Sequence, residues 1–193
     1  MGVGRRASSA PAPARYRAGV AAPVPTIRPT GPEDAHAWCA FVAREQTRTY
    51  RDVMPPDFGT HRLAQVEADA VELAAEIATG RQRVVQAEVD GEIVGAAKAG
   101  PAPAAWEIAE GFVPVPADQQ LDRLYLHPDH HGTGLADRLL AEVVLPGPVY
   151  LWLIHGNTRA ERFYARRGFR MLPEDFVSGP TWGNVVMRRM LRD

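Results

Sequence analysis

Residues 126–140 read LHPDHHGTGLADRLL and place three histidines, an aspartate and two glycines ahead of an apolar stretch with helical spacing. Two kinds of chemistry suit these residue types. Histidine and aspartate are metal ligands. Glycines that lead into a helix let an anion such as phosphate approach the free backbone N–H groups at the positive helix end.

The metal alternative rests on three histidines and the aspartate between them, which are His127, His130, His131 and Asp129. Pro128 holds this segment extended, and no Cys, Glu or fourth His repeats nearby in a helix-matched pattern. We therefore expect no metal site. A histidine-based metalloprotein is kept as a rival, which predicts bound metal and no affinity for coenzyme A.

The anion alternative rests on Gly132 and Gly134, which have no side chain to keep a bulky anion away from backbone N–H groups. The strand pattern LDRLYLHP precedes them and the helical pattern GLADRLLAEVVL follows, so the loop exposes N–H groups at a helix start. Neither nucleotide signature fits, because GTG lacks the third glycine of G-x-G-x-x-G and the Lys-Ser/Thr pair of a P-loop is missing. The segment is predicted to be a phosphate cradle of another type.

Hydrophobic spacing predicts the elements that position this loop. Before it we expect a strand at 26–30 and two helices, one that opens at 31–34 and runs to about Thr49 and an amphipathic one at 60–79. A hairpin that turns at Asp90-Gly91 and a long loop at 101–118 follow these helices. After it we expect the helix from about Gly134, a buried strand at 149–154, a helix capped by Asn157 and stopped at Gly168, and strands at 169–172 and 184–191.

This order, written βααβββαβαβ, indicates an α+β domain whose sheet is covered by helices on both sides. The 193 residues fit one such domain with some appended sequence. Residues 1–25 are rich in Ala, Pro, Gly and Arg without apolar periodicity and are predicted to be a disordered tail. The domain is therefore expected at 26–193.

The overall composition limits the classes of binding partner that we expect. With 22 basic and 23 acidic residues the net charge is -1, so nothing pulls the chain toward nucleic acid or an anionic membrane. The only cysteine, Cys39, suggests a reducing compartment, and no run reaches the length of a membrane span. We expect a cytoplasmic protein with a small partner, and a homodimer is left open.

Two motifs carry a specific resemblance. The run from His131 to Ala136 looks like the Gln/Arg-x-x-Gly-x-Gly/Ala loop of the GCN5-related N-acetyltransferase (GNAT) superfamily, and LDRLYLHPDH before it is similar to that family's fourth strand. Residues 157–169, NTRAERFYARRGF, resemble the family's Asn-x-x-Ala-x-x-x-Tyr-x-x-x-Gly-Phe motif. His131 departs from the usual Gln or Arg. The resemblance covers about 26–192 and implies a mixed, mainly antiparallel central sheet.

The resemblance also implies a site for acetyl-CoA between two diverging strands, LDRLYLHP and VYLWLI. The backbone of Leu124 to Leu126 would bind the pantetheine arm as an added strand, and residues 132–137 would hold the pyrophosphate. Asn157 would contact the cofactor near the thioester besides capping its helix. The expected cofactor residues are Leu124, Tyr125, Leu126, His131, Gly132, Thr133, Gly134, Leu135, Ala136, Asp137 and Asn157.

Tyr164 matches the family's tyrosine, which is placed to donate a proton to the sulfur of coenzyme A. The structural alternative is a core tyrosine beside Phe163. We expect the acid role, because one member of a Phe-Tyr pair on a helix usually turns away from the core.

The base is less well defined. Asp122 stands at a strand position where the family often carries an acid, and a partly apolar cleft would raise its pKa usefully. A salt bridge to an arginine explains Asp122 equally well. His127, Glu88 and Asp118 are rival bases.

Acceptor contacts are expected from the first helix pair and the 101–118 segment, namely from Tyr50, Phe58 and Trp106. Family members that acetylate ribosomal-protein N-termini carry Glu in strand five, where this chain has Trp152. Nothing else selects among an aminoglycoside, a polyamine, an amino acid or a protein amine. The expected activity is transfer of an acetyl group from acetyl-CoA to a primary amine of a small molecule, by direct attack in a ternary complex. The alternative is a non-catalytic acyl-CoA-binding regulatory module, which would be indifferent to loss of Tyr164.

Overall fold

The computed structural model of the chain describes residues 23–193. Residues 1–22 of the tail expected at 1–25 therefore lie outside the described residues. The strands are β1 (Thr26–Pro29), β2 (Arg83–Val89), β3 (Glu92–Pro101), β4 (Gln119–Leu126), β5 (Val149–Ile154), β6 (Arg170–Val177) and β7 (Val186–Arg192). The helices are α1 (Ala35–Tyr50), α2 (Phe58–Ala64), α3 (Val66–Ala78), α4 (Ala105–Ala109), α5 (Leu135–Val143) and α6 (Thr158–Ala165). Short 3-10 turns lie at η1 (Pro32–Asp34), η2 (Pro128–His130) and η3 (Pro180–Trp182).

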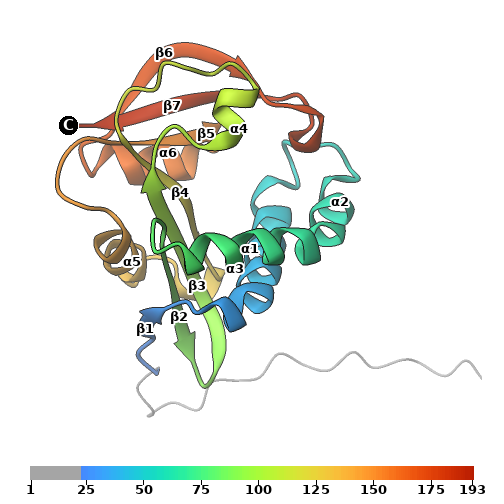
Figure 1. Cartoon of the computed structure of the whole chain (residues 1–193), viewed down its shortest axis with the longest axis vertical. Coiled ribbons are helices and arrows are strands. Elements are labelled where there is room, and N and C mark those ends of the chain that lie inside the picture. The colour runs from blue at the N-terminus through green and yellow to red at the C-terminus, as the bar shows by residue number, and fades with distance from the viewer. Residues whose placement is uncertain (1–22) are drawn as a thin grey trace, which may run out of the picture.

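The strands form one sheet in the order β1-β2-β3-β4-β5-β7-β6. Every neighbouring pair is antiparallel except β4 and β5. Helices α1 and α3 cover one face, and α5 and α6 cover the other (Figure 1). The expected fold class, a mainly antiparallel sheet flanked by helices on both faces, is therefore what the chain adopts.

Local chemistry explains the most regular turn. Asp90 and Gly91 both have positive φ, at 52° and 82°, as a two-residue hairpin turn of the primed type requires. Strands β2 and β3 pair on either side of it, as the sequence predicted.

Three details differ from the expected order. The sheet has seven strands, which match the seven strand segments expected from the sequence, whereas the written order βααβββαβαβ counts only six. The helix expected at 60–79 is two helices that meet at Gln65, and periodicity misses the break because it continues across a single residue. The prediction of a loop over the whole of 101–118 is wrong, because the segment contains α4, whose five residues are too few to display a period.

The feature that positions the site is a divergence of β4 and β5. They pair only at Gln120↔Tyr150 and Leu121↔Leu151. Beyond this point β4 stays paired with β3 as far as Leu126, and β5 pairs with β7. One edge of β4 therefore faces a gap in the middle of the sheet, as the resemblance implied.

Within residues 23–193, none of the helices combines the length and the apolar character needed to cross a bilayer. The expectation of a cytoplasmic location stays a prediction.

Candidate active site

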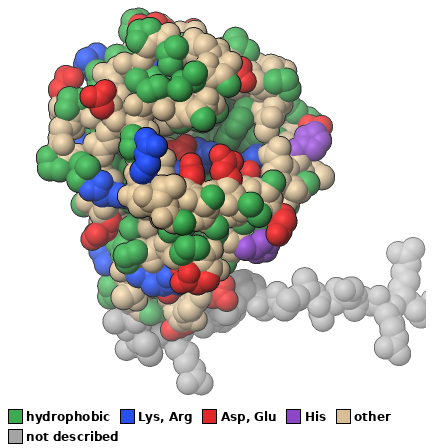
Figure 2. Space-filling view, viewed as in Figure 1, with side chains coloured by type: hydrophobic (Ala, Val, Ile, Leu, Met, Phe, Trp, Pro, Cys, Tyr) green, Lys and Arg blue, Asp and Glu red, His purple; other side chains and the backbone are tan. Residues whose placement is uncertain are grey.

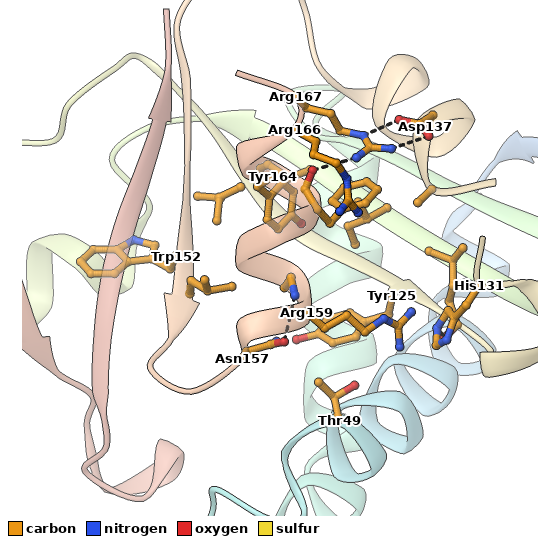
Figure 3. A pocket seen from close by; sticks show the side chains of 18 of the residues that line it. Thr49, Tyr125, His131, Asp137, Trp152, Asn157, Arg159, Tyr164, Arg166 and Arg167 are labelled. Carbon is orange, nitrogen blue, oxygen red and sulfur yellow. Dashed lines mark hydrogen bonds and ion pairs between the residues drawn. The ribbon is translucent and has the colours of Figure 1, made fainter. Parts of the chain in front are cut away.

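A cavity of about 510 Å³ lies at the gap between β4 and β5, bordered by the start of α5 and by α6 (Figure 3). Nine of the eleven expected cofactor residues line it: Leu124, Tyr125, Leu126, His131, Gly132, Gly134, Ala136, Asp137 and Asn157. The expected catalytic residues Tyr164 and Asp122 and the expected acceptor residue Tyr50 line it too. The fold thus brings both sequence motifs to one cavity.

The glycine loop has the conformation that its residue types indicate. Gly132 and Gly134 have φ of 78° and 83°, a region that favours glycine, and a Cβ at either position would meet no protein atom within 4 Å. Gly134 is the N-cap of α5, so the first N–H groups of that helix lie beside the loop. This arrangement is suited to an anion.

Thr133 and Leu135 do not line the cavity. The Thr133 hydroxyl donates a hydrogen bond of 2.8 Å to the carbonyl oxygen of His130. The Leu135 side chain is buried in the core against the sheet. The backbone N–H of Leu135 donates to the Thr133 hydroxyl oxygen at 3.4 Å, so neither residue offers the cavity a free side chain.

His131 turns its ring back onto β4. Its Nε2 lies 3.1 Å from the carbonyl oxygen of Leu126, so the ring carries its proton on Nε2 and donates to that oxygen. Burial and the nearby charge of Arg159 lower the pKa of His131, which keeps the ring neutral. His127 instead accepts from the backbone N–H of Asp129. In the part of the chain that the structure describes, no group of three His, Cys, Asp or Glu is placed to hold a metal ion.

Helix α6 supplies the opposite wall. Asn157 caps it, with Oδ1 accepting from the backbone N–H of Ala160 at 3.2 Å, which leaves its amide NH₂ for another partner. Arg159, Arg166 and Arg167 add positive charge to the lining. The sequence did not single out these arginines, although they lie within or beside the second motif.

Arg167 ties α6 to the first turn of α5. Its guanidinium forms an ion pair with Asp137, lies 3.5 Å over the ring of Phe163 and donates to the Phe163 carbonyl oxygen at 2.7 Å (Figure 3). This set of contacts fixes the glycine loop relative to α6.

Three tyrosines line the cavity. The expectation that Tyr164 turns away from the core is wrong, because its ring packs in the main core against Phe163 and Phe169. It also lines the cavity, and none of the hydrogen bonds among residues 23–193 involves its hydroxyl. Burial raises its pKa well above the ordinary value, so the hydroxyl stays protonated. The hydroxyls of Tyr50 and Tyr125 lie 3.4 Å apart.

Two expected acceptor residues are not in the lining. Phe58 is buried against Tyr50, with ring centroids 6.3 Å apart. Trp106 packs on Trp152, with centroids 5.5 Å apart. Each therefore packs against an aromatic residue that lines the cavity and does not itself line it, so the expected direct contact is corrected to a packing role.

Asp122 lies in a β-bulge. Lys98 of β3 pairs with Arg123 and Ala99 pairs with Leu121, so Asp122 has no partner across the strand pair. The bulge brings the carboxylate of Asp122 into contact with the guanidinium of the next residue and within 3.2 Å of Lys98 Nζ.

The expectation of a raised pKa for Asp122 is wrong. Desolvation acts in that direction, but the positive charges of Arg123 and Lys98 outweigh it and lower the pKa. The rival bases lie elsewhere: Glu88 pairs with Arg28, and neither His127 nor Asp118 lines the cavity. The carboxylates in the lining are Asp122 and Asp137.

Beside the cavity, one buried carboxylate accepts hydrogen bonds from two aromatic side chains. Glu107 of α4 has no exposed surface and accepts from the Tyr150 hydroxyl at 2.7 Å, the Trp152 indole N–H at 2.8 Å and the Ala104 backbone N–H at 2.7 Å. Phe112 and Phe176 pack on Trp152. On the face shown in Figure 2, a hollow with acidic and basic side chains on its floor opens in the middle of the molecule.

Comparison with known sequences identifies relatives. Residues 80–171 match the family described as Acetyltransferase (GNAT) domain. An uncharacterized N-acetyltransferase of Mycobacterium tuberculosis strain H37Rv is 31% identical over 139 residues, which is 67% of this chain and 81% of that protein. An uncharacterized N-acetyltransferase of Mycobacterium bovis matches to the same extent, at 31% identity over 139 residues.

Solved structures share the fold. The PaiA N-acetyltransferase from Thermoplasma acidophilum, solved in complex with coenzyme A, aligns with a TM-score of 0.62 at 16% identity over 86% of this chain and 98% of that chain. A GCN5-related N-acetyltransferase from Rhodopseudomonas palustris aligns with a TM-score of 0.61 at 20% identity over 91% of this chain and 99% of that chain. The expected fold is confirmed.

Proposed function

Because the chain belongs to the GNAT family of acetyltransferases, we propose that it transfers the acetyl group of acetyl-CoA to a primary amine of a small molecule, by direct attack in a ternary complex. The observation that carries this proposal is the single cavity at which the open edge of β4, the glycine loop and α6 meet. These are the parts that the two motifs indicated.

The cavity suits acetyl-CoA in shape and charge. Backbone groups of β4 beyond Leu121 are unpaired toward β5 and are available to the amide groups of the pantetheine arm. The start of α5 and the two left-handed glycines suit the pyrophosphate. Arg159 and Arg166 line the same cavity and add charge complementary to phosphate.

Bound acetyl-CoA supplies an acyl group activated as a thioester. Tyr164 keeps its proton, because burial raises its pKa, and its unpaired hydroxyl faces the cavity. In the proposed reaction it protonates the departing sulfur. This role needs a hydroxyl that no other side chain engages, which is the state of Tyr164 among the described residues.

Asp122 is proposed to receive the acceptor amine. Its lowered pKa keeps it ionised, so it attracts an ammonium group and accepts a hydrogen bond from it. The proton that the amine must lose before attack passes to solvent through water hydrogen-bonded to Asp122, because a carboxylate with a lowered pKa does not keep a proton itself.

The first test is titration calorimetry with acetyl-CoA. Wild-type protein should bind it, and Gly134→Glu should not, because the new carboxylate fills the cradle and repels phosphate. Gly80→Glu is the matched control, since Gly80 also has positive φ, at 66°, with open space around it, but follows α3. Equal binding by wild type and Gly134→Glu, or absence of binding by the wild type, would refute the site.

A further inference from the structure

Next to Asp122, opposite charges are balanced. Asp122 contacts Lys98 and Arg123, and Glu76 of α3 also contacts Lys98. Two carboxylates thus face two cations. Asp69, also on α3, pairs with Arg62 at 2.6 Å. An acceptor with several ammonium groups would bring further positive charge to carboxylates that are already paired.

Arg123 differs from its neighbour Arg62 in its spare donors. Arg62 uses all three nitrogens, on Gln46, Gln65 and Asp69. Arg123 donates only through Nη1, to the carboxylate and the carbonyl oxygen of Asp122. Its Nε and Nη2 have no partner among residues 23–193, and its side chain is 30% exposed.

The guanidinium of Arg123 is also held in place. Its contact with Asp122 fixes one end, and the ring of Trp182 lies 6.0 Å from it, within cation–π range. A planar, oriented guanidinium with free N–H groups on two nitrogens is the usual partner of a carboxylate.

Resting on the proposed function, we propose that the acceptor is an amino acid whose amine lies at Asp122, in the cavity lining, and whose carboxylate is bound by Arg123, which is not part of that lining but is 30% exposed and contacts Asp122. The two side chains touch, so the anionic group and the amine they bind must be only a few bonds apart. An α-amino acid meets this condition. Because it brings one charge of each sign, it also leaves the balance of the ion cluster unchanged.

The test compares each common α-amino acid with its own amide, which keeps the amine and the side chain but lacks the anionic group. Release of coenzyme A thiol is followed with acetyl-CoA, and rates are expressed per unprotonated amine. At least one amino acid should show kcat/KM about tenfold or more above that of its amide, a factor typical of one charge-assisted pair. Spermidine should be a poorer acceptor than that amino acid.

Variants assign the preference to Arg123. Arg123→Gln should abolish the preference for the amino acid over its amide, mainly by raising KM for the amino acid. Arg123→Lys should restore part of this preference. Arg170→Gln, which removes a 58% exposed arginine of β6 that pairs with Asp193, is the matched control and should keep it. Thermal melting and acetyl-CoA titration show whether each variant is folded.

The inference is overturned if amides or spermidine react as well as amino acids, if no amino acid reacts in a protein that binds acetyl-CoA, or if folded Arg123→Gln keeps the preference. These results leave the acetyl-CoA site standing. Failure of the wild type to bind acetyl-CoA would instead overturn the proposed function itself, so the two failures are distinguishable.

Discussion

The indole N–H of Trp152 donates a 2.8 Å hydrogen bond to the carboxylate of Glu107, which joins the central strand β5 to the short helix α4. Glu107 is fully buried, and the groups that reach it are all donors. One acidic side chain thereby fixes both the 101–118 segment and an aromatic residue of the cavity lining.

Glu107→Gln should therefore destabilise the protein although it conserves shape. One acceptor oxygen becomes an NH₂ group that faces donors, which leaves a buried hydrogen bond unmade and costs about 1–3 kcal/mol. Urea unfolding measures the loss. Glu110→Gln, at the exposed end of the same helix, is the control. A loss no larger than that of the control would contradict this account.

Tyr164→Phe should lower kcat by about 100-fold or more, because it removes the proposed proton donor, and should leave acetyl-CoA affinity unchanged. Stability should change little, since the hydroxyl has no hydrogen-bond partner among residues 23–193. Steady-state thiol release and calorimetry separate the two effects. Unchanged kcat would remove Tyr164 from the mechanism, and a chain that binds acetyl-CoA but never turns over would be a binding module.

Asp122→Asn should destabilise the fold in a pH-dependent way. The folded pKa is below the ordinary 3.8, so the ionised carboxylate contributes stability above that pH and loses the contribution as pH falls further. We expect a loss of about 2–3 kcal/mol near neutral pH, because Arg123 loses its carboxylate partner.

The difference in stability between wild type and Asp122→Asn should shrink as unfolding is measured at pH values below 3.8. Asp175→Asn, which removes an exposed ion pair with Arg188, should have little effect at any pH. A pH-independent difference for Asp122→Asn would mean that the ion pairs are not its source.

His131 should make acetyl-CoA binding tighten as pH falls. In the free protein its pKa is below the ordinary 6.5, and phosphate groups nearby would favour the protonated ring and raise that pKa. The complex then holds more protons than the free protein in this range, so affinity should rise between about pH 7.5 and 5.5. Calorimetry should show a flatter profile for His131→Gln, in which the titration of the ligand itself is unchanged. Parallel profiles would exclude His131 as the cause.

Local rules explain which parts of the structure could be predicted. The Asp90-Gly91 hairpin and the cap from Asn157 to Ala160 depend on residues close in sequence, and both formed as expected. The glycine loop did so as well, because its backbone conformation is available to few other residues.

The ion pairs of Asp122 could not be predicted from the sequence in the same way. Whether Asp122 meets a cation depends on the strand register, and a bulge opposite Lys98 and Ala99 leaves no mark in the alternation of residue types. Phe58 and Trp106 were misplaced for a related reason, since a bulky aromatic side chain has the same sequence signature whether it lines a cavity or packs behind it.

Only two residue pairs join β4 to β5, so the sheet consists of two half-sheets, β1 to β4 and β5 to β6, that share a short seam. Backbone amides of β4 that face the gap beyond Leu121 lack a strand partner there and should exchange quickly with deuterium. A pantetheine arm lying along that edge would supply the missing partner. Cosubstrate binding would then slow exchange on both sides of the seam and make the two half-sheets move as one body.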